Sequence, residues 1–503
     1  MSVVTEQSDL WALDWRNRAA AMGMPWYAPQ QPSAIEAPYP VAFNDDVAAL
    51  LDIDAERARR EGYAEVLSGN RLPPGAEPVA HRYGGHQFGI WAGQLGDGRA
   101  ITLGDMVNAR GQVYDIQLKG AGKTPYSRFA DGRAVLRSTI REYLGSEALA
   151  GLGIPTTRAL AIVGSDAPVY RETVETSAIL TRVAPSLVRF GSFEMLFYDR
   201  RFDDLAPLAD AVIQHHHPEL AAIENDYERY RAWVVRVIEL TASLIADWQA
   251  VGFCHGVLNT DNMSVLGLTL DYGPFGFMDS FDPDWICNHT DEAGRYTYNR
   301  QPAIGLWNLG RFVQAILPLL AEEPDAAVEI GQNLLEDYRS AYDRAYQARM
   351  QAKLGLVEAA EGDAELVASL LKLMARDGAD FTRSFRALGE VSAAPSASAA
   401  PFIDEFVDRE GAEAWLADWR ARLGEAEADD AARRVRMHLV NPKYILRNYL
   451  AQHAIERAEN GDYSEIERLH AILRRPFDEQ PEHADYARLP PDWARGLVLS
   501  CSS

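Results

Sequence analysis

Apolar and polar residues alternate along several short stretches in the first part of the chain. The residues 99–103 and 113–118 each show the period-two pattern of a β-strand, and glycine-rich turns separate them. A further strand is expected over 178–183. These segments predict a small antiparallel sheet between His81 and Arg189.

A helical spacing of apolar residues interrupts this sheet once. Leu136, Ile140, Tyr143 and Leu144 lie on one face of a helix expected over 134–150, which ends at the glycines at 151 and 153. A second apolar stripe precedes Gly252 and predicts a long helix; its members are Trp233, Val234, Val237, Ile238, Ile245 and Trp248. Beyond about residue 343 the pattern is helical, broken by VSAAPSASAAP at 391–401, which is typical of a flexible loop or linker.

This order of elements predicts an α+β protein with the bilobal arrangement of the protein kinase-like fold. Residues 1–80 are rich in proline and aromatic residues, contain one expected helix over 46–67, and are expected to wrap a neighbouring core. A β-rich lobe over 81–190 and a helical lobe over 191–345 follow. Residues 346–503 are expected to form a C-terminal helical extension.

Composition excludes several classes of function. The 503 residues carry a net charge of −24 and no run of Lys and Arg, which argues against nucleic-acid binding. No stretch approaches the roughly 18 uninterrupted apolar residues of a membrane span. The first residues, MSVVTEQSDLWALDWRNRAA, resemble neither a signal peptide nor a transit peptide, so a cytoplasmic protein is expected. Three scattered cysteines indicate reduced thiols rather than a disulfide scaffold.

The nonapeptide CHGVLNTDN at 254–262 is close to the catalytic loop of a kinase. A kinase has an Asp at the third position of its H-R-D or H-G-D motif, and this chain has Val257 there. Asn262 falls where the metal-binding Asn of a kinase belongs, and LDYG at 270–273 resembles the D-F-G motif, in which the Asp, here Asp271, binds Mg²⁺. The nearest carboxylate that could accept a proton is Asp261. In the alternative, Asn262 and Asp271 only cap turns.

The β-rich lobe offers groups for phosphate binding. The turn GQLGDGR at 93–99 permits close approach of backbone N–H groups to phosphate oxygens, although such a turn is often only a tight hairpin. Lys119 follows the strand at 113–118, where a kinase places the amine that binds phosphates and pairs with a helical Glu. Glu142 and Glu147 are both candidates for that pairing, and the apolar periodicity favours Glu147. Arg182 and Arg189 add more positive charge than a kinase needs near its nucleotide.

Four long segments resemble the selenoprotein O family, called YdiU in bacteria. They are HRYGGHQFGIWAGQLGDGRA at 81–100, LKGAGKTPYSRFADGRAVLRSTIREYLGSEA at 118–148, HGVLNTDNMSVLGLTLDYGPFGFMD at 255–279 and NPKYILRNYLAQ at 441–452. The resemblance covers nearly the whole chain. It implies a kinase-like fold in which ATP lies in a flipped orientation and AMP, rather than phosphate, is transferred to a protein hydroxyl.

The resemblance also implies roles for individual residues. It makes Asp261 the proton acceptor, Asn262 and Asp271 the ligands of Mg²⁺, with Mn²⁺ as the alternative, and Glu142 the partner of Lys119. The nucleotide-binding residues that it implies are Gly96, Gly98, Arg99, Lys119, Asp131, Gly132, Arg182 and Arg189. The expected partners are protein substrates with Ser, Thr or Tyr hydroxyls, and the enzyme itself is a candidate acceptor. Redox control of the family suggests a Cys287–Cys501 disulfide as a hypothesis, with three free thiols as the alternative.

Three other functions stay open from the sequence. A conventional phosphotransferase is disfavoured by Val257, and a non-catalytic nucleotide-binding scaffold leaves Lys119, Asn262 and Asp271 without a purpose. The third is transfer of UMP from UTP by the same site. The identity of the base cannot be read from the sequence.

Overall fold

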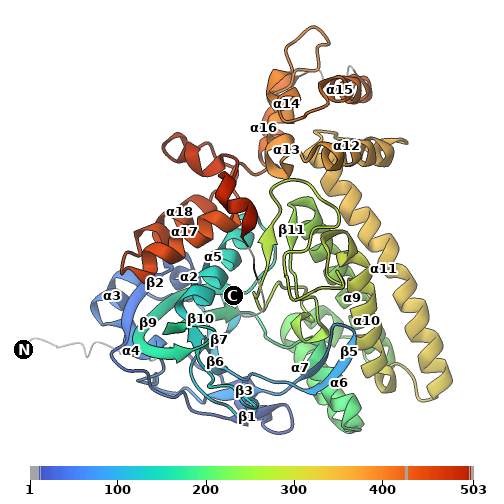
Figure 1. Cartoon of the computed structure of the whole chain (residues 1–503). Helices are drawn as coiled ribbons and strands as arrows, with labels where there is room; N and C mark the ends of the chain where they lie inside the picture. Colours follow the sequence, from blue (N-terminus) through green and yellow to red (C-terminus); the bar gives the residue numbers. More distant parts are fainter. Residues whose placement is uncertain (1–10, 12, 425–428, 498, 500–503) are drawn as a thin grey trace, which may run out of the picture.

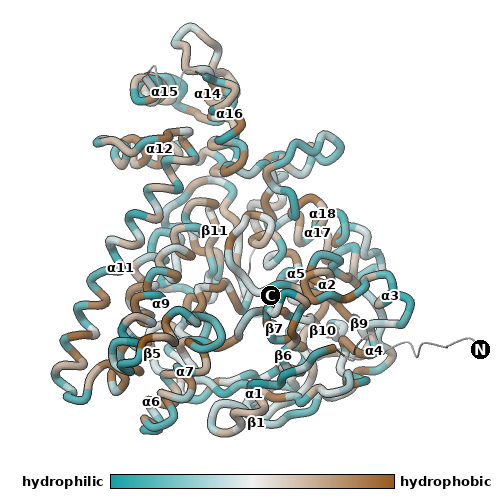
Figure 2. The backbone as a smooth tube through the Cα atoms, turned by 180° about the vertical axis from the view of Figure 1, so that it is seen from behind, coloured by the Kyte–Doolittle hydropathy of each residue, from teal (hydrophilic) through white to brown (hydrophobic). Residues whose placement is uncertain are grey.

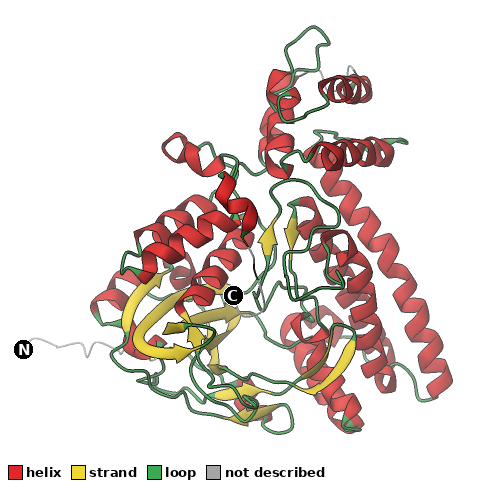
Figure 3. Cartoon of the chain, viewed as in Figure 1, coloured by secondary structure: helices red, strands yellow, loops and turns green. Residues whose placement is uncertain are grey.

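The chain folds into a sheet-rich N-terminal part and a helical C-terminal part. The computed structural model describes residues 11, 13–424, 429–497 and 499. The strands of the large sheet gather on one side of the molecule and the long helices stand on the other (Figure 1, Figure 3). The predicted α+β class is confirmed, whereas the division of the chain into four units stays a prediction.

One antiparallel sheet of eight strands forms the N-terminal part. Its order is β1-β3-β6-β7-β10-β9-β2, and β8 pairs with β10. The strands are β1 (Tyr27–Pro29), β2 (Tyr39–Phe43), β3 (Val79–His81), β6 (Ala100–Val107), β7 (Val113–Lys119), β8 (Ala134–Val135), β9 (Arg158–Tyr170) and β10 (Val174–Ala184). The three expected strands are therefore found as β6, β7 and β10. The sequence did not predict β9, because Gly164 and Pro168, which usually end strands, lie inside it.

The N-terminal segment covers one face of this sheet. It supplies β1, β2 and β3, the helix α1 (Arg18–Met22), and α2 (Asp45–Leu50), α3 (Ala55–Arg60) and α4 (Tyr63–Leu67). Val47 and Leu67 pack against Ile101 and Ile116 of the sheet. The single helix expected over 46–67 is wrong. Left-handed backbone at Asp52 (φ 59°) and Gly62 (φ 69°) breaks it into three short helices.

The helix α5 (Leu136–Gly151) packs on the opposite face of the sheet, against β9 and β10. Its expected apolar stripe is buried, and Ile140 and Leu144 share a core with Leu180. The alternation along β7 gives Ile116 and Leu118 to the face under the N-terminal helices. Gln117 and Lys119 consequently project from the face that carries α5.

The helical part is built around a long central helix, α9 (Asp226–Ala250). All six residues of its predicted apolar stripe are buried, and the chain leaves it at Gly252 in a left-handed conformation (φ 70°). Its neighbours are α6 (Phe190–Tyr198), α7 (Leu205–His216), α8 (Pro218–Ala221), α10 (Gln301–Ala315) and α11 (Pro324–Lys353). Hydrophobic and hydrophilic segments alternate along α11 (Figure 2), as expected for a helix with one buried face. No helix in the described part of the chain is long and apolar enough to span a membrane.

Two further features position the functional site. The short strands β11 (Phe253–Cys254) and β12 (Gly276–Phe277) pair and hold the loop between them, which contains the turn η2 (Thr260–Asn262). A hairpin of β4 (Gly84–Gln87) and β5 (Ile90–Gln94) leaves the sheet-rich part and lies beside α6 (Figure 1).

The C-terminal residues form two helical groups. The helices α12 (Asp363–Asp377), α13 (Phe381–Leu388), α14 (Ala400–Ile403), α15 (Arg409–Leu423) and α16 (Asp430–His438) enclose a separate apolar core with Trp415 and Trp419. The segment 391–399 between α13 and α14 is irregular, as predicted. The helices α17 (Asn448–Glu459) and α18 (Ser464–Leu473) return to pack on α5.

Candidate active site

A cleft of about 710 Å³ lies between the sheet and the loop that joins β11 to β12. Ten of the residues that the sequence predicts for the site line this cleft. They are Gly96, Gly98, Arg99, Lys119, Asp131, Gly132, Arg182, Asp261, Asn262 and Asp271. The other two predicted residues, Glu142 and Arg189, are buried behind the lining.

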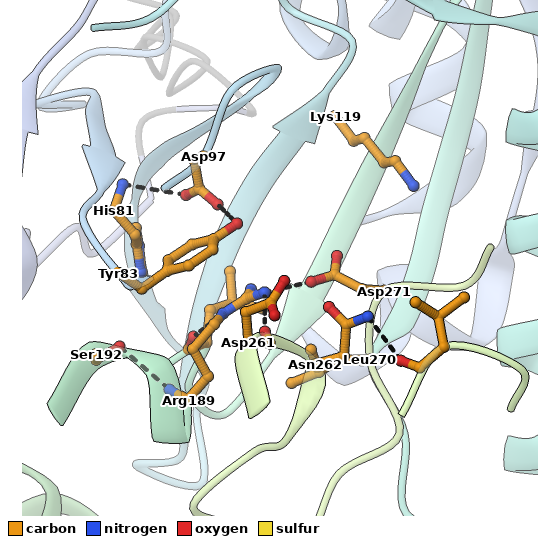
Figure 4. A network of polar contacts seen from close by, with 12 residues as sticks. His81, Tyr83, Asp97, Lys119, Arg189, Ser192, Asp261, Asn262, Leu270 and Asp271 are labelled. Carbon is orange, nitrogen blue, oxygen red and sulfur yellow. Dashed lines mark hydrogen bonds and ion pairs between the residues drawn. The ribbon is translucent and has the colours of Figure 1, made fainter. Parts of the chain in front are cut away.

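Buried ion pairs connect the sheet to the loop. Lys119 at the end of β7 and Arg182 on β10 both pair with Glu142 of α5. The guanidinium group of Arg182 also pairs with Asp271, and its Nη2 lies 2.8 Å from Oδ1 of that residue. Arg189 pairs with Asp271 too, and its Nη1 donates to the carbonyl oxygen of Asp261 at 2.9 Å (Figure 4). Three cations therefore share two carboxylates at the back of the cleft.

The partner of Lys119 is Glu142, and the preference for Glu147 from periodicity is wrong. The apolar stripe of α5 packs into the core, so a residue on that stripe points away from the cleft. Glu147 accordingly accepts hydrogen bonds from Arg158 at 2.7 and 2.9 Å and from the backbone of Ala159 at 3.0 Å.

The ion pairs fix the charges of the cleft. Burial lowers the pKa of Lys119 to about 8, and the neighbouring Glu142 limits this shift. Burial alone would raise the pKa of Asp271, but the charges of Arg189 and Arg182 hold it well below its usual range. At neutral pH Asp271 is therefore ionised, and most Lys119 side chains carry a proton.

Asp261 is a buried carboxyl group at the edge of the cleft. Burial raises its pKa to about 7, although a hydrogen bond from Gln87 and the charge of Arg189 lower it. Gln87 Nε2 donates to Oδ2 at 3.1 Å, and Oδ1 has no hydrogen-bond partner among the described residues. Val257, which stands where a kinase has its catalytic Asp, also lines the cleft but can accept no proton.

The oxygens of Asn262 and Asp271 suit a hard divalent cation. Asn262 Nδ2 donates to the carbonyl of Val257 at 2.9 Å, which turns the side chain and leaves its oxygen as a possible ligand. Asp271 has left-handed backbone (φ 58°). In the described part of the chain, no three His, Cys, Asp or Glu side chains gather as a metal site. A cation here would take most of its ligands from phosphate and water, which is the mode that Mg²⁺ prefers.

Several residues of the site were missed by the sequence reasoning. Gln87 positions Asp261, and the ring of Tyr83 lies 4.3 Å below the guanidinium carbon of Arg189. Arg171 forms two hydrogen bonds with Asp131, at 2.7 and 3.0 Å. Gln87 and Tyr83 come from the stretch 81–100, whose family resemblance marked it as important, but no single-residue pattern there indicated these roles.

The predicted Cys287–Cys501 disulfide stays a prediction, because Cys501 lies outside the described residues. Cys287 is buried, and its Sγ donates to the carbonyl of Cys254 at 3.4 Å. Burial raises the pKa of its thiol well above the usual value. The backbone N–H of His289 donates to the carbonyl of Leu499 at 2.9 Å, so the described end of the tail lies near this segment.

Comparisons with a family model and with individual proteins agree on one family. The family model described as protein adenylyltransferase SelO matches residues 9–474. The protein nucleotidyltransferase YdiU of Burkholderia orbicola (strain MC0-3) is 53% identical over 481 residues, which cover 93% of this chain and 92% of the relative. The protein of the same name from Thioalkalivibrio sulfidiphilus (strain HL-EbGR7) is 54% identical over 475 residues, covering 94% and 95%.

Proposed function

The chain belongs to the SelO family of protein adenylyltransferases, and from this premise we propose that it transfers AMP from ATP to Ser, Thr or Tyr hydroxyls of proteins, with release of pyrophosphate. It is a nucleotidyltransferase. The Lys119–Glu142 pair, Asp261 and Asn262 of the loop, and Asp271 lie at one cleft, which supports a kinase-like active site.

The observation that carries the proposal is the surplus of positive charge behind the cleft. Lys119, Arg182 and Arg189 outnumber Glu142 and Asp271, so the network lacks one negative charge. The β- and γ-phosphates of ATP would supply it. Their negative charge increases as the pyrophosphate leaves, and preorganised cations stabilise that change.

In the proposed mechanism Asp261 accepts the proton of the acceptor hydroxyl. The hydroxyl oxygen bonds to the α-phosphorus while the bond from that phosphorus to the oxygen bridging the α- and β-phosphates breaks. Gln87 holds the carboxylate of Asp261 in position. Gly96 and Gly98 line the cleft, where the lack of a side chain would let backbone N–H groups approach phosphates. Asn262 and Asp271 would hold Mg²⁺, or alternatively Mn²⁺, which would neutralise phosphate charge.

The alternatives make different predictions for the product. A kinase would transfer the γ-phosphoryl group and form ADP, but Val257 offers no base where that reaction requires one. A non-catalytic nucleotide-binding scaffold would use the buried cations to bind phosphates but would need no proton acceptor at Asp261. Transfer of UMP from UTP uses the same groups and differs only in the base.

The experiment that tests the proposal is incubation with acceptor proteins and ATP labelled separately at the α and γ positions. We expect the α label to become protein-bound and the γ label to appear as pyrophosphate. Protein-bound γ label would support the kinase, and neither label on protein would support the scaffold. A parallel reaction with α-labelled UTP and Mn²⁺ measures the preference for the nucleotide.

A further inference from the structure

An aromatic surface continues from the cleft along the β4–β5 hairpin. We define this hairpin surface by six residues: Phe88, Trp91, Tyr198, Arg295, Trp307 and Arg311. The rings of Trp91 and Tyr198 stack with centroids 4.0 Å apart. The ring of His86 lies 5.8 Å from Tyr198 of α6 and 5.4 Å from Trp307 of α10, which joins the hairpin to both helices. Phe88 and Tyr198 are both more than one-third exposed.

The hairpin is fixed in place relative to the helical part. His86, on β4, contacts the buried Glu194 of α6 through Nδ1. The backbone N–H of His86 donates to Thr260 Oγ1 at 2.7 Å. The hairpin surface is therefore held directly against the turn that contains Asp261.

Two arginines give this surface a positive charge that no carboxylate neutralises. The guanidinium carbon of Arg295 lies 4.7 Å from the ring centroid of Trp307, and that of Arg311 lies 5.3 Å from it. In the described part of the chain neither arginine has a carboxylate within ion-pair distance, and the Nε atom of each is buried without a hydrogen-bond partner. Arg82, at the start of the same hairpin, does have such a partner in Asp199.

Arg295 and Arg311 have no carboxylate partner among the described residues although the protein is acidic. The chain has 73 acidic and 49 basic residues, so carboxylates are abundant. An arginine that stacks on an aromatic ring and has no carboxylate partner can bind a carboxylate or phosphate group. The hairpin surface therefore combines apolar contact area with an unused site for negative charge.

The hairpin surface is continuous with the site of the proposed reaction. The backbone N–H of Phe88 donates to Asn259 Oδ1 at 3.3 Å and to Tyr296 Oη at 2.9 Å. Asn259 and Gln87 line the cleft beside Asp261. A Cβ atom at Gly89 would lie 3.1 Å from the guanidinium carbon of Arg295, so this arginine lies against the hairpin turn. An acceptor hydroxyl at Asp261 would place neighbouring residues of its chain over this surface.

We propose that the hairpin surface binds the segment of a protein substrate that flanks the acceptor hydroxyl, and that it selects segments with acidic side chains near that hydroxyl. The proposal rests on the proposed function, because it names the substrate class of the same site. Charge complementarity between Arg295, Arg311 and the segment provides the selection. The aromatic rings provide contact area for the backbone and apolar side chains of the segment.

Binding of fluorescent peptides tests this proposal independently of transfer. The peptides have equal length and one Ser, Thr or Tyr, and they differ only in having Glu, Gln or Lys at the flanking positions. With an ATP analogue that has a methylene group between the α- and β-phosphates, so that AMP cannot be transferred, and with Mg²⁺ present, we expect the Glu peptides to bind about tenfold more tightly than the Gln peptides. The Lys peptides should bind most weakly, and the preference should decrease with added salt.

Two double variants test whether Arg295 and Arg311 cause the preference for Glu peptides. Arg295→Gln with Arg311→Gln should reduce the affinity for Glu peptides to that for Gln peptides. Arg339→Gln with Arg344→Gln removes the same charge from exposed positions on α11 and should keep the preference. Equal or undetectable binding of all peptides to the wild type, or a preference that survives the first double variant, would overturn the proposal. Failure of α-label transfer would overturn the proposed function and leave this binding result unaffected.

Discussion

Two buried ion networks, one in the cleft and one in the C-terminal part, differ in the sign of their surplus charge. In the cleft, Lys119, Arg182 and Arg189 share Glu142 and Asp271. In the C-terminal part, the fully buried Arg447 pairs with Asp380, with Nη1 2.8 Å from Oδ2, and with Asp279. The first network has one cation too many and the second has one carboxylate too many.

The sign of the surplus charge distinguishes an ion network that can bind a polyanion from one that has a structural role. Asp380 also caps α13 by accepting a hydrogen bond from the backbone of Arg383 at 2.9 Å, so its network joins the segment after β12 to the C-terminal helices. A triphosphate would be repelled there and attracted in the cleft. Burial of charge alone therefore does not identify a functional site. A cavity of about 590 Å³ also borders Asp279 and Asp380, so the sign of the surplus charge is what distinguishes the two networks.

The largest effect is expected from Asp271→Ala. Loss of this carboxylate removes a proposed metal ligand and the partner of Arg182 and Arg189, so nucleotide transfer should fall on the order of 10³-fold. The matched variant Asp279→Ala removes a carboxylate from the other network and should keep transfer near the wild-type rate. Rates of α-label incorporation measure both, and circular dichroism confirms that each variant is folded. Similar losses of nucleotide transfer in both variants would contradict the distinction between the two ion networks.

Arg447→Met tests the structural network. Removing this arginine leaves Asp380 buried without its charge partner, which should destabilise the protein by about 3–5 kcal/mol. Transfer by the folded fraction should stay within about twofold of the wild type, because the cleft network is separate. Urea denaturation followed by tryptophan fluorescence gives the stability. Unchanged stability with lost transfer would assign Arg447 to the active site.

Lys353 is a buried amine that has no carboxylate partner among the described residues. Burial lowers its pKa to about 7, and its amine lies 4.2 Å from the ring centroid of Phe385. Between pH 7 and 10 the unfolded chain holds more protons at this site than the folded chain, so this group makes stability rise with pH.

Lys353→Met should therefore stabilise the protein most at pH 7. Its advantage over the wild type should decrease by about 3–4 kcal/mol as the pH rises to 10. Denaturation midpoints across this range measure the effect. A difference between variant and wild type that does not change with pH would show that the lysine stays charged in the folded state.

The smallest effect on nucleotide transfer is expected from substitutions of Glu142 and Glu147, which both lie on α5. Glu142→Gln weakens the anchor that Lys119 and Arg182 share, so transfer should fall about tenfold, mainly through a higher KM for ATP. Glu147→Gln weakens the contacts with Arg158 and with the backbone of Ala159, so it should change stability more than transfer. Steady-state kinetics of both variants make the comparison. A larger loss of transfer in Glu147→Gln would contradict the assignment.

Sequence reasoning predicted the parts of the structure that follow local periodicity. The stripe of α9 and the alternation of β7 are examples, because burial of one face dictates both patterns. It could not predict which way a residue at the end of a stripe points, so periodicity selected Glu147 over Glu142. Gln87 was missed because its role depends on a hairpin that crosses to a loop more than 170 positions later, as the 174-residue separation from Asp261 shows.

The most direct test of the central claim is a complete product balance in one reaction. Pyrophosphate, ADP and protein-bound nucleotide are quantified per ATP consumed, with Asp261→Asn as the blank. We predict one pyrophosphate for each protein-bound AMP and no ADP above the blank. Stoichiometric ADP with protein-bound phosphate would contradict the claim that this cleft transfers the nucleotide.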